Sequence, residues 1–378
     1  MKLIHLSDLH IGKKINEFSM LEDQKYIFDR ILQIVGKEEP QGILLAGDIY
    51  DKSVPSAEAV ALFDHFLTRL SEKKVPLFII SGNHDNPQRL SFGGNIMRNS
   101  KIYVSPVFSG KIEPVILSDD HGEVAVFLLP FLKPAHVRSA YPEAEIDSYQ
   151  AAVKRVIGDM TVLSHRRNVL VAHQFVTGGT TCGSEDVYVG DTGNISADLF
   201  EEFDYVALGH LHGPQNISRE TLRYCGSPLK YSFSEASHTK SVTVVELEEK
   251  GKVSIRTVPL EPLRDMREIR GKYMEISARS FYQGTKIDDY IHVILTDEED
   301  IPDALAKLGS IYPNIMRLTY DNTRTRTNQE ILALEGDAVK HPLEIIGALY
   351  EMQNNCPMNE TQRELAENLY KQIWEVEQ

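Results

Sequence analysis

Short apolar runs that each end in a potential metal ligand recur along this chain, and they constrain its fold more than any other feature. In one of them, the run at residues 42–46 is followed by Gly47 and Asp48. An apolar run of this length predicts a buried strand. A parallel strand buried on both faces delivers the next residue to the carboxyl edge of its sheet, where ligands bind. Asp48 is therefore predicted to lie in a functional site.

Four further strand ends repeat this pattern, after predicted strands at residues 1–7, 75–80, 168–172 and 205–208. The polar residues that follow the five strands are Asp8 and His10, Asp48, Asn83 and His84, His173, and His210 and His212. Each of them alone is more often a helix cap, a turn residue or a histidine with an ordinary hydrogen-bond partner. Because all five strand ends share the pattern, the set predicts one metal site.

The donor types narrow the choice of metal. Imidazole, carboxylate and amide oxygen together suit Mn²⁺, Fe²⁺ or Zn²⁺, whereas Ca²⁺ binds oxygen ligands. The set exceeds what one ion needs, and two ions about 3.5–4 Å apart that share a carboxylate would use all of it. Asp48, the single carboxylate on the central loop, is the predicted bridge. Since such a pair of ions clamps a phosphoryl group, the predicted reaction is phosphoester hydrolysis.

The rest of the sequence predicts an α/β fold followed by two smaller parts. The further elements expected within residues 1–262 are helices at 19–35, 57–70, 88–97 and 147–165, a strand at 124–131, and antiparallel strands at 241–247 and 253–258. They predict a layered α/β sandwich with its helices outside. Residues 263–321 predict a small α+β domain, 322–339 a polar linker and 340–378 a helical hairpin.

Composition limits the location and the partners. The net charge of −15 argues against a free-standing nucleic-acid binder, so positive charge for such a ligand must come from local patches, metal ions or a partner. The three cysteines, Cys182, Cys225 and Cys356, are far apart and odd in number, which indicates reduced thiols and a cytoplasmic protein. No apolar run reaches the roughly 18 residues of a membrane span.

The strand-end motifs resemble a known family. Asp8-Leu9-His10, Gly47-Asp48, Gly82-Asn83-His84-Asp85, Ala172-His173 and Gly209-His210-Leu211-His212 are similar, in order and residue type, to the calcineurin-like metallophosphoesterases. Residues 46–51, 54–56 and 223–235 resemble more narrowly the SbcD family of nuclease subunits, and with the later parts the resemblance covers essentially the whole chain. It implies a metallophosphoesterase nuclease domain at 1–262, a capping domain at 263–321 and a hairpin at 340–378 that binds the SbcC ATPase.

The resemblance also implies roles for the site residues. It implies two Mn²⁺ per subunit, with Mg²⁺ able to serve in part. One ion would be held by Asp8, His10, Asp48 and His212, and the other by Asp48, Asn83, His173 and His210. His84 would be the catalytic histidine that assists the leaving oxygen, with Asp85 in a supporting role; the alternative is that His84 only braces its loop through Asp85. Asp51 departs from relatives that carry a histidine there.

The implied activity is that of a subunit of a double-strand-break and hairpin processing complex. With SbcC it would act as an ATP-dependent 3′–5′ double-strand exonuclease and single-strand endonuclease, ATP being used only by SbcC. Candidate contacts to duplex and hairpin DNA are Lys13, Lys14, Arg166, Arg167, Arg317, Arg324 and Arg326. The family also implies a homodimer through the helices at 57–70 and 88–97, for which packing within one subunit is the alternative.

Two other functions are compatible with the same residues. A phosphatase or cyclic-nucleotide phosphodiesterase would use the same ions on small substrates, and a non-catalytic scaffold would only recruit the ATPase. The predicted hairpin carries two apolar stripes, formed by Leu343, Ile346 and Tyr350 and by Leu365, Leu369, Ile373 and Trp374. Because exposing them forgoes on the order of 10 kcal/mol, they must pack either on SbcC or on the chain's own core.

Overall fold

The computed structural model describes residues 1–185, 193–325, 346–347, 350 and 358–366. The chain divides into two compact units, Met1–Met266 and Arg267–Gln378. Arg326, most of the linker predicted at 322–339 and most of the hairpin predicted at 340–378 lie outside the described residues. Within the second predicted hairpin helix, residues 360–366 are helical. Among the described residues no helix combines the length and apolar character needed to cross a bilayer.

Two mixed six-stranded sheets form the centre of the first unit. The first has the strand order β16-β15-β1-β4-β5-β6. Its strands are β1 (Lys2–Leu6), β4 (Gly42–Ala46), β5 (Leu77–Ile80), β6 (Ile102–Val104), β15 (Ser241–Leu247) and β16 (Val253–Pro259). β1, β4, β5 and β6 run parallel, and β15 pairs antiparallel with both β1 and β16. The predicted antiparallel pair at 241–247 and 253–258 is thus present.

The second sheet has the order β13-β14-β12-β9-β8-β7. Its strands are β7 (Val115–Asp119), β8 (Gly122–Leu129), β9 (Arg167–His173), β12 (Tyr205–Gly209), β13 (Gln215–Ile217) and β14 (Arg219–Tyr224). β8, β9, β12 and β14 run parallel. The strands that precede the predicted ligands are therefore β1, β4 and β5 in one sheet and β9 and β12 in the other, all in the interior of their sheets.

The two sheets pack face to face through a shared apolar core. Leu3, Leu44 and Phe78 from the first sheet meet Val126 and Val171 from the second in this core. Because successive strand residues point to opposite faces, the remaining apolar residues of each strand need a second cover. Strands buried in this way on both faces read as continuous apolar runs, which is the pattern seen in the sequence.

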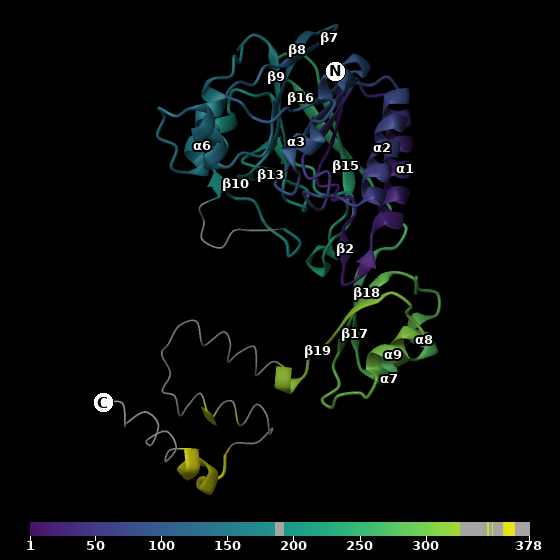
Figure 1. Ribbon diagram of the computed structural model, residues 1–378. Coiled ribbons are helices and arrows are strands. Elements are labelled where there is room, and N and C mark those ends of the chain that lie inside the picture. The colour runs from purple at the N-terminus through teal and green to yellow at the C-terminus, as the bar shows by residue number, and fades with distance from the viewer. Residues whose placement is uncertain (186–192, 326–345, 348–349, 351–357, 367–378) are drawn as a thin grey trace, which may run out of the picture. The chain divides into compact units, whose positions relative to one another are not determined.

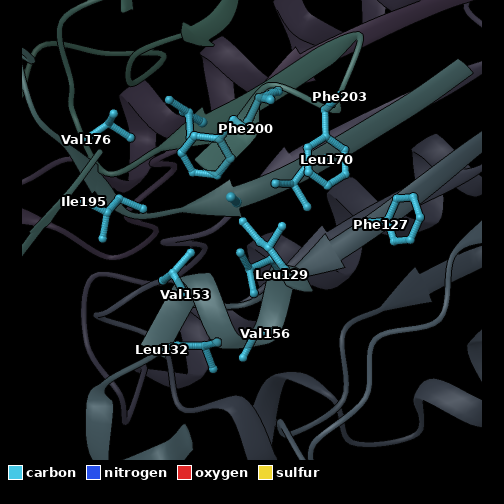
Figure 2. Close-up of a cluster of buried hydrophobic side chains, with 14 of the residues drawn as sticks. Phe127, Leu129, Leu132, Val153, Val156, Leu170, Val176, Ile195, Phe200 and Phe203 are labelled. Atoms are coloured by element: carbon cyan, nitrogen blue, oxygen red, sulfur yellow. The ribbon is translucent and has the colours of Figure 1, made fainter. Parts of the chain in front are cut away.

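Helices supply that cover on the outer faces (Figure 1). α1 (Leu21–Glu38) and α2 (Ala57–Glu72) lie side by side on one side of the sheets, with the rings of Phe28 and Phe66 stacked 4.6 Å apart. α6 (Tyr149–Gly158) lies on the other side, where Val153 and Val156 pack against the second sheet (Figure 2). The first unit is therefore a four-layered α/β sandwich, which confirms the predicted fold class.

Shorter elements connect these layers. They are β2 (Lys14–Ile15), β3 (Phe18–Ser19), β10 (Phe175–Val176), β11 (Asn194–Ile195), α3 (Pro87–Leu90), α4 (Gly94–Met97), α5 (Pro134–Ala140) and the 3₁₀ turns Arg98–Ser100, Ala197–Phe200 and Phe233–Glu235. The single helix predicted at 88–97 is wrong: α3 ends at Leu90, and Gly93 has a left-handed φ of 73° that α-helix cannot continue through. The helix predicted at 147–165 ends earlier, at Gly158.

The sequence of the helix at 57–70 predicts that Val60, Phe63, Leu67 and Leu70 lie on one buried side, and this prediction is partly wrong. α2 turns Ala59, Phe63, Phe66 and Leu70 into the core. Val60, by contrast, is 45% exposed and faces away from it. α2 therefore carries apolar residues on an outward face as well as on its core face.

The second unit is built on a three-stranded sheet of order β17-β18-β19. Its elements are β17 (Met266–Gly271), β18 (Tyr290–Leu295), β19 (Ile315–Tyr320), α7 (Tyr273–Ile276), α8 (Arg279–Tyr282) and α9 (Ala304–Gly309). Ile276, Val293, Leu308 and Tyr312 belong to its apolar core. The sequence of this part predicts strands at 290–295 and 315–320 and a helix at 303–308, and all three are present, so it has the expected α+β character.

Candidate metal centre

The side chains predicted from the five strand ends meet at the carboxyl edge of the two sheets. Three clusters of potential ligand atoms, each with all its atoms within 4.8 Å of one another, share members. The clusters are Asp8 with His10 and His212, Asp8 with Asp48 and His173, and His10 with Asp48 and His84. They join residues that are more than 200 positions apart in the sequence, so the convergence is a property of the fold.

Asn83 and His210 complete the group. The amide oxygen Oδ1 of Asn83 lies 2.9 Å from Nε2 of His173 and 3.0 Å from Nδ1 of His210. The backbone N–H of His210 donates to Oδ1 of Asp8 over 3.0 Å. All eight predicted side chains therefore lie in one cluster, which is called the strand-end cluster below.

Asp48 occupies the middle of the strand-end cluster. Its Oδ2 lies 3.3 Å from Nε2 of His173, 3.6 Å from Nε2 of His10 and 3.9 Å from Nε2 of His84. Its Oδ1 accepts a hydrogen bond of 2.9 Å from the backbone N–H of His84. One carboxylate thus faces both halves of the cluster, as a bridging ligand would.

Four residues of the cluster have left-handed backbone conformations that are uncommon outside glycine. The φ angles are 53° at Asp8, 43° at His10, 49° at Asp48 and 104° at His210. Each such residue costs on the order of 1–3 kcal/mol and persists only where the surrounding structure enforces it. This strain gathers at the strand-end cluster, which is typical of a functional site.

Glycines before the ligands are required by close packing. A Cβ at Gly82 would lie 2.1 Å from Oδ1 of Asp48, and one at Gly209 would lie 1.9 Å from the carbonyl oxygen of Ala46. A Cβ at Gly47, whose φ is 85°, would lie 2.4 Å from Nδ1 of His173. The glycines of the Gly-Asp, Gly-Asn-His and Gly-His motifs therefore let the strand ends approach one another closely.

Hydrogen bonds fix the orientation of two imidazole rings. Nδ1 of His173 lies 2.7 Å from the carbonyl oxygen of Ala46, and Nδ1 of His84 lies 3.0 Å from the carbonyl oxygen of Asp51. Since a carbonyl only accepts, each Nδ1 carries the proton and each Nε2 is left to face the cluster. Nε2 of His173 is thus available as a ligand.

Residues outside the motifs hold the loops in place. Asp85, predicted to have a supporting role, accepts hydrogen bonds from the backbone N–H groups of Ile49, Tyr50 and Gly82, over 3.1, 3.0 and 2.9 Å. It therefore fixes the backbone just after Asp48 and just before Asn83.

Gln24 and Tyr231 hold the loop that carries His10, and the sequence analysis missed both. The amide nitrogen of Gln24 donates to the carbonyl of His10 over 2.7 Å, and the hydroxyl of Tyr231 donates to the carbonyl of Leu9 over 2.5 Å. Gln24 is fully buried on the core face of α1, three residues before Ile27. A polar residue on an otherwise apolar helix face was the available signal.

The electrostatics of the cluster suit a cation. Burial raises the pKa of Asp8 to about 6. Burial also works to raise the pKa of Asp48, but His173 and the neighbouring imidazoles hold it well below its usual value. Burial lowers the pKa of His210 to about 3, so that ring is neutral. In addition, Nδ1 of the fully buried His10 has no hydrogen-bond partner among the described residues. Buried carboxylates beside imidazoles and an amide oxygen form a donor set that Mn²⁺, Fe²⁺ or Zn²⁺ fits.

A fourth cluster consists of Cys182, His212 and Glu235. Its members form hydrogen bonds with the chain and do not make a further cation site. Glu235 is fully buried and already paired with the ammonium group of Lys240. Burial raises the pKa of the Cys182 thiol to about 12, which disfavours the thiolate that a metal requires. A cation placed there would meet Lys240 and a protonated thiol.

The predicted phosphate contacts are spread over the molecule. Lys13 lies nearest to the cluster, with its Nζ 2.8 Å from Oδ1 of Asp51, and Lys14 is exposed on β2. The prediction for Arg167 is wrong: its side chain is buried in an ion pair with Asp119 at the opposite end of β9, and Arg166 beside it pairs with Glu123. Arg317 and Arg324 belong to the second unit, where Arg324 pairs with Asp300 over 2.8 Å.

Comparison with known proteins assigns the family. Residues 1–214, which contain all five strand-end motifs, match the model of the calcineurin-like phosphoesterases. Residues 262–354 match the model described as the type 5 capsule protein repressor C-terminal domain. The chain is also 34% identical over 374 residues to the SbcD component of the nuclease SbcCD of Staphylococcus epidermidis, covering 92% of this chain and 99% of that protein. This chain belongs to the calcineurin-like phosphoesterases and is an SbcD homologue.

Two solved structures are similar at low sequence identity. A dimetal phosphatase from Danio rerio is 12% identical, with a TM-score of 0.43 over 69% of this chain and 99% of that chain. A Thermus thermophilus protein is also 12% identical, with a TM-score of 0.37 over 68% of this chain and 98% of that one. The family assignment comes from the sequence matches alone.

Membership confirms the family predicted from the motifs, and it makes this SbcD homologue a metal-dependent phosphoester hydrolase. A calcineurin-like phosphoesterase works with divalent metal, and the strand-end cluster provides the matching donors. The identity and number of the ions and the role of each side chain are matters for the proposal that follows.

Proposed function

We propose that this SbcD homologue is a Mn²⁺-dependent DNA nuclease that hydrolyses phosphodiester bonds with two metal ions. The observation that carries the proposal is the convergence of ligand-type side chains from five strand ends, with Asp48 facing both halves of the cluster. The relative from Staphylococcus epidermidis, matched over almost its full length, is a nuclease subunit, which supports DNA as the substrate class.

The ligand assignment follows the two halves of the cluster. One Mn²⁺ is held by Asp8, His10, Asp48 and His212, and the second by Asp48, Asn83, His173 and His210. When bound, such ions neutralise charge on the phosphoryl oxygens and lower the pKa of water. Mg²⁺, another hard cation, replaces Mn²⁺ in part.

His84 acts on the leaving oxygen. Its Nδ1–H donates to the carbonyl of Asp51, so Nε2 is the atom that exchanges a proton with substrate. The side chain is 18% exposed, unlike the buried His10 and His173, and it is accessible to a phosphodiester at the edge of the cluster. Lys13, held beside the cluster by Asp51, is placed to contact a phosphate of the same strand.

The SbcC ATPase is the proposed partner, because the Staphylococcus epidermidis relative is named as a subunit of SbcCD. With SbcC and ATP, the nuclease degrades duplex ends 3′ to 5′ and cleaves single strands and hairpins. Residues 1–262 then serve as the nuclease domain, 263–321 as the cap, 322–339 as the linker and 340–378 as the SbcC-binding hairpin. The free thiols of Cys182 and Cys225 fit a cytoplasmic location.

A homodimer through α2 and the segment at 87–97 completes the proposed assembly. Phe92 is 83% exposed, Ile96 is 76% exposed, and Val60 on the outward face of α2 is 45% exposed. Val60 and Phe92 help line a cavity of about 350 Å³ at this surface. Large exposed apolar side chains are typical of protein interfaces, which favours the homodimer over packing within a single protomer.

The decisive experiment incubates a hairpin-ended DNA duplex with Mn²⁺ and the purified chain, with and without SbcC and ATP. Mn²⁺-dependent cleavage that Asp48→Ala abolishes supports the proposal. Rapid turnover of small phosphoesters together with no cleavage of DNA in any mixture would instead favour the phosphatase or phosphodiesterase alternative. No hydrolysis of either substrate, with full recruitment of SbcC, would favour the scaffold.

A further inference from the structure

Three separate segments of the first unit meet on the side of His212 that faces away from the strand-end cluster. Ser184 comes from the loop after β10, Glu235 from the 3₁₀ turn Phe233–Glu235, and Lys240 from the residues just before β15. None of them belongs to the strand-end motifs. Glu235 is fully buried and Lys240 is 5% exposed, so a buried charge pair stands directly behind a proposed metal ligand.

The hydrogen bonds in this region form a chain in which each donor points toward Glu235. The hydroxyl of Ser184 donates to Oε1 of Glu235 over 2.5 Å, because a carboxylate only accepts. The oxygen of that hydroxyl then accepts from Nδ1–H of His212, which lies 2.7 Å away. With the proton on Nδ1, the lone pair of His212 is on Nε2, which faces the cluster 3.0 Å from Nε2 of His10.

Further contacts keep the chain rigid. Lys240 donates to Glu235, to the hydroxyl of Ser227 over 2.9 Å and to the carbonyl of His212 over 2.8 Å. Glu185, next to Ser184, accepts from the backbone N–H of His212 over 2.5 Å. The backbone and the ring of His212 are thus both held by the loop that carries Ser184.

We propose that Ser184 and Glu235 are positioning residues that fix His212 as a metal ligand through its Nε2 atom. The hydroxyl of Ser184, polarised by its hydrogen bond to the Glu235 carboxylate, accepts the Nδ1–H of His212. This hydrogen bond sets the tautomer of the ring and increases the electron density on Nε2. Lys240 keeps Glu235 charged and in place. This inference rests on the proposed metal centre and adds the residues that tune one of its ligands.

Metal binding by Ser184→Ala tests the inference, measured by calorimetric titration of Mn²⁺ into metal-free full-length protein. Loss of such a supporting hydrogen bond typically weakens metal affinity by about 10–100-fold, and that shift is expected here for one of the two ions. Ser184→Thr keeps a hydroxyl and is expected to retain the wild-type affinity. Thr181→Ala is the matched control, because Thr181 is an exposed hydroxyl residue of the same loop.

Two additional measurements separate positioning from a general structural role. The melting temperature of the metal-free Ser184→Ala protein should fall only modestly, because Glu235 keeps its bond from Lys240 and His212 keeps its backbone bond to Glu185. The Mn²⁺ concentration that gives half-maximal hydrolysis should rise, while the rate at saturating Mn²⁺ returns close to that of wild type. A lower metal-free melting temperature with unchanged Mn²⁺ affinity would overturn the inference.

His212→Ala distinguishes failure of the inference from failure of the metal centre. If His212→Ala loses one Mn²⁺ and Ser184→Ala binds both ions as wild type does, the positioning role is wrong and the metal centre stands. If His212→Ala also binds both ions with wild-type affinity, the ligand assignment itself is wrong, and the role of Ser184 is overturned with it.

Discussion

Two buried polar clusters lie at the two ends of strand β9 (Arg167–His173), and they differ in whether their charges are paired within the chain. At its amino end, Arg167 forms an ion pair with Asp119, and both side chains are less than a tenth exposed. Both terminal nitrogens of Arg167 are bonded, to Asp119 and to the carbonyls of Leu247, Glu248 and Gly122. Each charge at this end therefore has its counter-charge within the chain.

At its carboxyl end, the same strand delivers His173 to the strand-end cluster. There the carboxylates of Asp8 and Asp48 are buried among imidazoles without a lysine or arginine paired to either among the described residues. Nδ1 of His10 lies 3.7 Å from Oδ1 of Asp51 and lacks a hydrogen-bond partner in the described part of the chain, and four residues have left-handed backbone conformations. The charges at the amino end are paired within the chain and serve the fold. The carboxylates at the carboxyl end are left for a cation to neutralise and serve function.

Replacement of Asp48 should produce the largest effect. Asp48→Ala removes the carboxylate shared by both halves of the cluster, so Mn²⁺ binding and DNA cleavage should both fall to background. Cleavage of an end-labelled hairpin duplex and the metal content of the purified variant measure this. Wild-type cleavage by Asp48→Ala would mean that the cluster is not the hydrolytic centre.

Replacement of His84 separates catalysis from metal binding within the strand-end cluster. His84→Ala removes the proton donor to the leaving oxygen, and cleavage should decrease by about 10²–10⁴-fold. Mn²⁺ content should stay at the wild-type value, because His84 is assigned to substrate. If the variant loses metal in proportion to activity, His84 is a metal ligand and its assignment to the leaving oxygen is wrong.

Replacement of Asp119 tests the opposite end. Asp119→Asn leaves Arg167 buried with its carboxylate removed, which should lower the free energy of unfolding by about 3–5 kcal/mol. Chemical denaturation followed by circular dichroism measures the loss. The cleavage rate per folded molecule should stay unchanged, since the cluster lies at the other end of β9; a reduced rate in fully folded protein would contradict the division between the two ends.

The same pair predicts a pH dependence. Hydrogen bonds from Arg167 hold the pKa of Asp119 below its usual value, so the carboxylate contributes stability that is fully present above about pH 5. As the pH falls below about 4, the ordinary value for Asp, this contribution is lost. The difference in unfolding free energy between wild type and Asp119→Asn should therefore shrink on acidification. A difference that stays constant down to pH 2 would exclude the ion pair as its source.

Replacement of Asp8 should give the smallest effect, and one of opposite sign. In metal-free protein the buried carboxylate lacks its cation, so Asp8→Asn should raise the free energy of unfolding by about 1–3 kcal/mol. The measurement needs chelator-treated protein, with Asp119→Asn as the contrasting variant. Destabilisation of the metal-free protein by Asp8→Asn would show that the chain already compensates this charge.

The sequence was sufficient for the strands and their ligands because both carry strong local signals. β4 and residues 169–172 of β9 are continuous apolar runs; His173 directly follows one of them, and Asp48 follows the other after Gly47. The resemblance to the family motifs then assigned the residues after separate strands to one metal site. What could not be predicted depends on tertiary contacts, since Ser184 and Glu235 are 51 positions apart in the sequence and only the fold brings the hydroxyl of Ser184 to both Glu235 and His212.

The errors have equally local causes. Arg166 and Arg167 looked alike as a basic pair, but strand alternation turns Arg167 inward to Asp119. The helix predicted at 88–97 ignored Gly93, whose left-handed conformation divides it. On α2, the apolar periodicity could not reveal that Val60 faces outward. In each case the residue type was evident from the sequence, and the direction of the side chain required the fold.

Anomalous diffraction from crystals soaked in Mn²⁺ tests the central claim most directly. Two peaks are expected in the strand-end cluster, one among Asp8, His10, Asp48 and His212 and the other among Asp48, Asn83, His173 and His210, with Asp48 contacting both. Absence of anomalous density from this cluster, in crystals of protein that cleaves DNA with Mn²⁺, would contradict it.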